Sequence, residues 1–248
     1  MDAQVVLIAL GILVLAFFSG MLGFGVALAS VPYLSLFYAD LAREVQPMSI
    51  ALGGITALLA AIGFARYGYM EWRYAWRMAV IAALTAPAGV WLAHRVAPAL
   101  LWVLYFVSVS YLLYRMVHPR FLEAKREASL GWALALTVPI TVYSTMLGVG
   151  VGFLLVPTLI ALGMEPKRAA GSNALVVFAQ SATAFVAHLP TARLDSVALA
   201  AALATGALGA YLGARFTSLR LGGKQVRWTF ALLMGAMMLY KAWTLVWG

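Results

Sequence analysis

The sequence contains no cysteine among its 248 residues. The chain therefore has no thiols with which to form disulfides, thiolate metal sites or a cysteine nucleophile. Charged side chains are also scarce, at 10% of residues, whereas 65% are hydrophobic and the mean hydropathy is +0.95. Soluble domains are only about half apolar. The composition predicts an all-α polytopic membrane protein and removes most support for redox or zinc chemistry.

Motifs that carry catalysis are missing as well. The sequence has no HExxH, no GxSxG, no Walker loop and no pair of carboxylates within an apolar segment. We therefore expect no enzyme, no catalytic residue, no bound metal and no cofactor. The net charge of +9 would suggest nucleic acid in a soluble protein, but the basic residues lie in short stretches between apolar segments. There they act as topology signals, so we expect a lipid bilayer as partner and no nucleic acid.

A glycine-rich stretch occurs twice. Residues 19–34 read SGMLGFGVALASVPYL, and residues 144–159 read STMLGVGVGFLLVPTL, with nine of sixteen positions identical at an offset of 125. Unrelated apolar segments would share only about one or two, so the match indicates an internal duplication. The duplicated feature is a break inside an apolar run.

Apolar segments extend the duplication to the whole chain. A bilayer core is about 30 Å thick and needs about 20 apolar residues per helix. Ten segments satisfy or approach this length, five in each half, and the first two of each half are short and joined by the break. This predicts eight to ten membrane helices in two repeats, residues 1–118 and 131–248, joined by a charged cytoplasmic linker, 119–130. The expected segments are 3–18, 24–39, 46–65, 77–94, 99–117, 130–146, 150–163, 171–189, 196–214 and 227–247.

An odd number of segments per half inverts the second copy, an arrangement common among secondary transporters. The loop charges agree, because thirteen basic residues fall on one side and four on the other. By the positive-inside rule, both termini then lie outside a cytoplasmic (inner) membrane. Whether the first two segments of each repeat span the bilayer or re-enter it is left open. The four residues on the outer side are Arg43, Arg95, Arg193 and Lys241.

The breaks are the best candidates for a binding site. Unwound backbone at membrane depth leaves N–H groups without partners, and a helix that begins just after a break presents its positive dipole end. Such a helix end binds an anion without a charged side chain. Small hydroxyl and amide side chains near the breaks could add hydrogen bonds. The predicted substrate-binding residues are Ser19, Gly23, Gly25, Ser144, Thr145, Gly148, Gly150, Ser172 and Asn173.

Each candidate also has a purely structural interpretation. Glycines let membrane helices pack closely, and Ser172 and Asn173 could cap the eighth segment instead of binding an anion. Ionisable residues within the spans are almost lacking. His94 and His188 lie near segment ends, where a structural or interfacial role is favoured over a proton relay. A coupling ion, H⁺ or Na⁺, and assembly as a homodimer are left open.

Residues 146–175, MLGVGVGFLLVPTLIALGMEPKRAAGSNAL, resemble the signature of the toluenesulfonate uptake permease (TSUP) family, also called TauE/SafE-type sulfite exporters. MLGFGVALASVPYLSLF in the first half is a looser copy. The resemblance implies a bacterial or archaeal carrier of sulfite, sulfonates, sulfoacetate or related small organic anions. The small polar element is retained at 171–173, Gly-Ser-Asn, but reads Gln-Pro-Met at 46–48, which predicts an asymmetric site.

The sequence as a whole predicts a secondary transporter that moves a small anion by alternating access between two inverted repeats. A passive anion channel with the same architecture is one alternative. A membrane scaffold subunit that transports nothing and uses its glycines only for packing is another.

Overall fold

The computed structural model describes residues 3–21, 23–117 and 130–220, together with eight single positions between 225 and 243. All regular structure within these residues is helical, which confirms the all-α prediction. The helices are α1 (Ala3–Gly20), α2 (Ala27–Leu34), α3 (Gln46–Arg66), α4 (Trp72–Ala93), α5 (Pro98–Val117), α6 (Leu130–Met146), α7 (Gly152–Ala161), α8 (Pro166–His188) and α9 (Ser196–Arg220), with a π-helical turn, η1 (Leu41–Val45), leading into α3.

These helices correspond to the first nine expected segments. The tenth, 227–247, lies outside the described residues apart from single positions, and so does the linker 119–130 except for Leu130. One expectation about the eighth segment is wrong. Helix α8 begins at Pro166 and not near residue 171, because proline has the backbone angle of a first helical turn already set. Ser172 and Asn173 therefore lie inside α8, and neither caps it.

Helix lengths divide the elements into two kinds. Among the described residues, five stretches are long and apolar enough to cross a membrane: α1, η1 with α3, α4, α8 and α9. Helices α2 and α7 have only 8 and 10 residues. At 1.5 Å per residue they extend about 12 and 15 Å, roughly half of a bilayer core. The chain after each break therefore forms a half-length helix.

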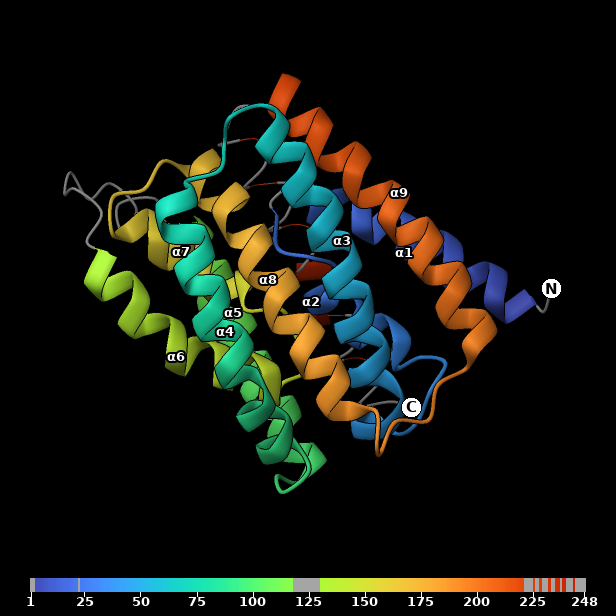
Figure 1. Ribbon diagram of the computed structural model, residues 1–248. Coiled ribbons are helices and arrows are strands. Elements are labelled where there is room, and N and C mark those ends of the chain that lie inside the picture. Colours follow the sequence, from blue (N-terminus) through green and yellow to red (C-terminus); the bar gives the residue numbers. More distant parts are fainter. Residues whose placement is uncertain are drawn as a thin grey trace.

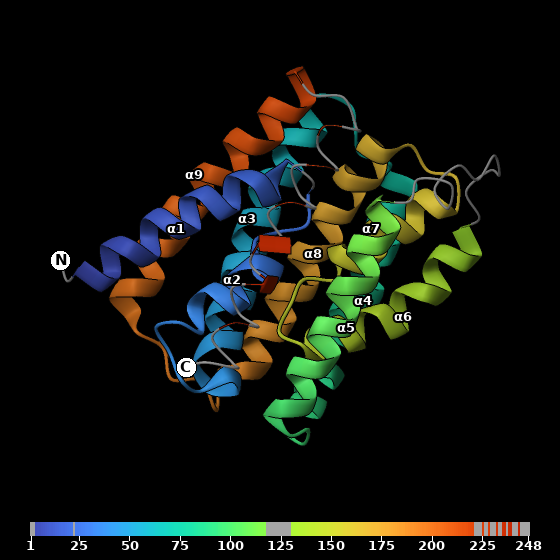
Figure 2. The ribbon, with the colours of Figure 1, turned by 180° about the vertical axis from the view of Figure 1, so that it is seen from behind.

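Helices α3 and α8 pack against each other in the middle of the bundle (Figure 1). Helices α1 and α9 lie side by side along one edge, and α9 also packs on α3. Helix α4 packs on both α6 and α8 at the opposite edge, and the view from behind shows the same arrangement (Figure 2). Each half of the sequence thus places one long helix against helices of the other half.

The outward faces of the long helices are apolar. Leu84 on α4, Val186 on α8 and Leu208 on α9 each expose more than half of their surface. Inside the bundle, glycines let helix backbones touch. A β-carbon at Gly213 on α9 would lie 2.0 Å from the Phe17 carbonyl oxygen of α1, and one at Gly20 would lie 2.3 Å from the Ala210 carbonyl oxygen. An apolar exterior around a closely packed interior is the arrangement expected of a multi-pass membrane protein.

Candidate functional site

Both breaks begin with the same helix ending. Gly23 after α1 and Gly148 after α6 have φ angles of 66° and 74°, in the left-handed region that favours glycine. The N–H of Phe24 donates to the Ser19 carbonyl oxygen at 3.3 Å, and the N–H of Val149 donates to that of Ser144 at 3.0 Å. These bonds, from a residue to the fifth before it, define the Schellman motif. The duplicated glycine therefore terminates a helix by a specific, hydrogen-bonded turn.

The half-length helices start a few residues later, and a polar side chain from a central helix holds each start. The N–H of Val26 donates to Thr56 Oγ1 of α3 at 3.0 Å. The N–H of Val151 donates to Gln180 Oε1 of α8 at 2.7 Å. Gln180 also donates through Nε2 to Thr145 Oγ1 at 2.8 Å and to the Val149 carbonyl oxygen at 3.2 Å. One amide thus organises most of the second break.

In each short helix, the two N–H groups that follow the one held by Thr56 or Gln180 have no partner within the described residues. Within the described residues, the N–H groups of Ala27 and Leu28 on α2 and of Gly152 and Phe153 on α7 form no hydrogen bond. All four residues are buried. Helices α2 and α7 therefore each present free donors and a positive dipole end inside the bundle.

The two breaks meet. A β-carbon at Gly150 would lie 3.0 Å from the Phe24 carbonyl oxygen, and one at Gly152 would lie 3.0 Å from Phe24 Cα. Val177 of α8 packs between the breaks, 3.1 Å from the β-carbon positions of both Gly25 and Gly150. The starts of α2 and α7 consequently share one buried region, although 125 residues separate them in the sequence.

One amide side chain from the opposite half of the chain bonds to each break. Asn173 Nδ2 donates to the Gly23 carbonyl oxygen at 2.9 Å, and Gln46 Nε2 donates to the Met146 carbonyl oxygen at 3.3 Å. Both side chains are fully buried, and within the described residues the oxygens Asn173 Oδ1 and Gln46 Oε1 have no hydrogen-bond partner. The region thus combines free backbone donors with free amide acceptors.

The hydroxyl residues predicted for the site have mixed surroundings. Ser19 and Ser144 are buried and accept the Schellman bonds through their carbonyl oxygens, and the Ser144 hydroxyl donates to Ile140 O of its own helix at 2.7 Å. Thr145 Oγ1 accepts from Gln180. Ser172 Oγ accepts the N–H of Glu71 at 2.9 Å, which ties α8 to the α3–α4 loop and not to a break.

Gln180 and Thr56 position the breaks, but the predicted site residues do not include them. Both are buried polar residues in the middle of long apolar helices. A polar residue in the middle of an apolar segment can be recognised from the sequence. It indicates a structural role, because a polar side chain in a membrane helix needs an internal partner.

The salt bridges of the described residues lie outside the breaks. The salt bridges within the described residues, Arg43–Asp40, Arg168–Glu71 and Arg168–Glu165, all lie at helix ends or loops. The same residues contain no cluster of three or more acidic or histidine side chains that could hold a metal ion. Within the described residues, the groups bonded at the breaks are backbone dipoles and neutral side chains.

A multi-pass helical bundle whose broken helices bring free backbone donors together in its interior has the construction of a membrane transport protein. Residues 7–241 match the family model described as Sulfite exporter TauE/SafE, and the chain belongs to this family of membrane transporters. The resemblance found in the sequence is thereby confirmed. A search of curated proteins and a search of solved structures each gave no match.

Replacing Gly148 by alanine should weaken the second break. The substitution strains a left-handed backbone, at about 1–3 kcal/mol, and places a β-carbon 2.3 Å from Gln46 Cγ. Gly68→Ala is the matched control, because Gly68 also has a positive φ, 73°, but nothing lies within 4 Å of its β-carbon position. We expect the thermal midpoint in detergent to fall further for Gly148→Ala than for the control. Equal shifts would show that the Gln46 contact is unimportant.

Replacing Gln180 by leucine should destabilise the protein. The change leaves the N–H of Val151 and the carbonyl of Val149 buried without this partner, at about 1–3 kcal/mol for each group. Thr183→Val is the control, because that hydroxyl bonds only to carbonyls of its own helix. We expect a clearly lower thermal midpoint for Gln180→Leu and a small change for the control. Similar midpoints would contradict the positioning role of Gln180.

Proposed function

We propose that the protein is a secondary transporter of a small anion in the cytoplasmic membrane, and that the anion binds where the starts of α2 and α7 meet. The observation that carries this proposal is the pair of buried helix starts with free N–H groups at Ala27, Leu28, Gly152 and Phe153. Two positive dipole ends favour an anion over a cation, and no charged side chain of the described residues is bonded to either helix start. Sulfite is the substrate that the family description names, and the resemblance seen in the sequence adds sulfonates and sulfoacetate.

We also propose that the two halves are inverted repeats. Two glycine contacts at corresponding positions in the two halves support this. A β-carbon at Gly89 on α4 would lie 2.4 Å from the Val142 carbonyl oxygen on α6. The contact at Gly213, between α9 and α1, falls on Phe17, and Phe17 and Val142 are separated by the same 125 residues as the breaks. By this packing, Gly89 corresponds to Gly213. Aligning the sequences GVWLAHR (89–95) and GAYLGAR (209–215) would instead pair Gly89 with Gly209, one helical turn earlier.

Alternating access would then move units that contain helices of both halves. Helix α9 packs on α1 and α3, and helix α4 packs on α6 and α8. A rocking motion between these two groups would take place across the α3–α8 contact and at the breaks. The contacts Asn173–Gly23 and Gln46–Met146 join the groups and would have to change in each cycle. The excess of basic residues on one side places both termini outside in this proposal.

The site would be asymmetric. At an offset of 125, Asn173 corresponds to Met48, which is also fully buried. Among the described residues, an amide therefore lies beside the helix start of α7 and not of α2: Asn173 Nδ2 lies 2.5 Å from the β-carbon position of Gly152. An anion would be held mainly against α7 and Asn173, with α2 supplying the second dipole end.

Counterflow in proteoliposomes tests the transport function. Vesicles loaded with unlabelled sulfite or sulfoacetate should transiently accumulate the labelled anion, because a transporter exchanges substrates. Asn173→Leu should lower this exchange at least about tenfold, the value of one lost hydrogen bond to a charged ligand. Met48→Leu is the matched control and should stay close to the wild type. A channel would only equilibrate the label, and a scaffold would give neither flux nor thermal stabilisation by these anions.

Labelling of introduced cysteines tests alternating access, since the chain has no cysteine of its own. Gln46 begins α3 and Asn173 lies two turns inside α8, each bonded to a different break, and both are fully buried. In a variant with Gln46→Cys and Asn173→Cys, reaction with an impermeant thiol reagent from one side should hold that side open and suppress reaction from the other. Gly131→Cys, in the exposed first turn of α6, should react throughout. Independent reaction at both buried positions would indicate a channel.

A further inference from the structure

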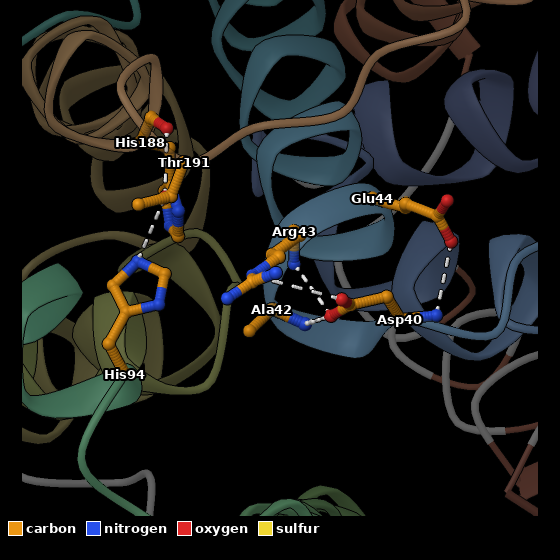
Figure 3. Close-up of polar contacts among 7 residues, drawn as sticks. All are labelled: Asp40, Ala42, Arg43, Glu44, His94, His188 and Thr191. Carbon is orange, nitrogen blue, oxygen red and sulfur yellow. Dashed lines mark hydrogen bonds and ion pairs between the residues drawn. The ribbon is translucent and has the colours of Figure 1, made fainter.

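Two histidines meet where α4 and α8 end. His94 is the C-cap residue of α4, and His188 is the last residue of α8. Their ring centroids lie 5.5 Å apart, with the ring planes at 67° (Figure 3). Both residues lie at negative ends of helix dipoles, which favour a positive charge on an imidazole.

The two rings differ in access to water and in hydrogen bonding. His188 is fully buried, and neither of its ring nitrogens has a hydrogen-bond partner within the described residues. His94 is exposed, and its Nε2 lies 3.3 Å from Thr191 Oγ1. The Thr191 hydroxyl donates to the His188 carbonyl oxygen at 3.2 Å, so its oxygen accepts from His94. We therefore assign the neutral His94 proton to Nε2, which leaves Nδ1 free to accept a second one.

Among the described residues, neither ring has an acidic partner. Ile50 of α3 packs with Val90 of α4 and Ala184 of α8 one turn away from the histidines, which makes this end of the bundle apolar.

Charged residues do lie nearby on η1, on the loop after α8 and beside His94, but within the described residues none forms an ion pair with a histidine. Asp195 instead caps α9, Glu44 accepts the N–H of Asp40, and Asp40 pairs with Arg43 at 4.0 Å. These charged residues are Asp40, Arg43, Glu44, Arg95, Arg193 and Asp195.

We propose that His94 and His188 form one proton-binding site that couples anion transport to a proton gradient. This inference rests on the proposed transport function. His94 takes a proton from water at Nδ1. Because neither His188 nitrogen has a hydrogen-bond partner within the described residues, the proton reaches His188 through a bridging water or a rotation of the rings. Because two adjacent imidazolium rings repel each other, the pair holds one proton at a time.

Proton binding also has a structural consequence. A charged His188 is unfavourable in a closed apolar end, so the proton favours the conformation in which water enters between α3 and the α4–α8 pair. The proton and the anion would then enter from the same side. Each proton offsets one negative charge of the substrate, which matters because the described part of the binding region has no cationic side chain. The expected coupling is symport.

Histidine NMR tests the site without any transport measurement. The chain has only three histidines, so ring resonances of ¹⁵N-histidine-labelled protein can be assigned with single His→Gln variants. We expect His94→Gln to change the titration midpoint of His188 by about one pH unit, because the two rings interact. The control is His118→Gln, whose position lies outside the described residues, and it should leave both midpoints unchanged. An unchanged His188 titration in His94→Gln would overturn the paired site.

Transport driven by a pH gradient tests the coupling, with labelled sulfoacetate as the probe because its sulfonate stays charged. We expect wild-type vesicles with an acidic exterior to accumulate sulfoacetate. His188→Gln should lower this accumulation at least tenfold, while its counterflow stays within twofold of the wild type. His118→Gln should keep both accumulation and counterflow. Wild-type counterflow without any response to the gradient would overturn proton coupling. Absent wild-type counterflow would instead contradict the transport function, and the NMR titration would then decide the proton site alone.

Discussion

The structure depends on satisfying backbone hydrogen-bonding groups where a membrane helix is interrupted. Away from water, each unpaired N–H or carbonyl group is costly. The chain meets this constraint with a Schellman turn at Gly23 and Gly148 and with side chains at the helix starts, Thr56 for Val26 and Gln180 for Val151. The first turns of α2 and α7 keep buried N–H groups that form no hydrogen bond within the described residues. Buried donors without a partner call for an explanation, and a bound anion supplies one.

The sequence predicted the helices and the breaks because both follow from local composition: apolar length determines the segments, and a duplicated glycine motif identifies their interruptions. Side-chain partners were harder to predict. Asn173 bonds to a carbonyl 150 residues away, and Ser172 to an N–H 101 residues away, so their roles depend on packing that no local pattern contains. The start of α8 was misplaced because the charged residues after Pro166 are typical of a loop, although they form its first turn.

Duplication has preserved the backbone more strictly than the side chains. The Schellman turns and the half-length helices recur in both halves, whereas the helix starts are held by a threonine hydroxyl in one half and a glutamine amide in the other. The Gln180 amide bonds three groups at once, and Asn173 lies about two turns before it on α8, where the first half has the apolar Met48 at the corresponding position. The fold therefore needs two similar breaks, but recognition of an anion can be concentrated at one of them.

Helix α8 connects the proposed anion and proton sites, since Asn173, Gln180 and His188 all belong to it. Asn173 and His188 are 15 residues apart, about 22 Å along a helix. At that distance two unit charges interact by under about 1 kcal/mol at an effective dielectric constant near 20, too little to couple two gradients strongly. A tilt of α8 against α3, however, would change both the Asn173–Gly23 contact and the closure around His188. Coupling between the two sites must therefore be mechanical, carried by the packing of α8, and not by direct electrostatic attraction.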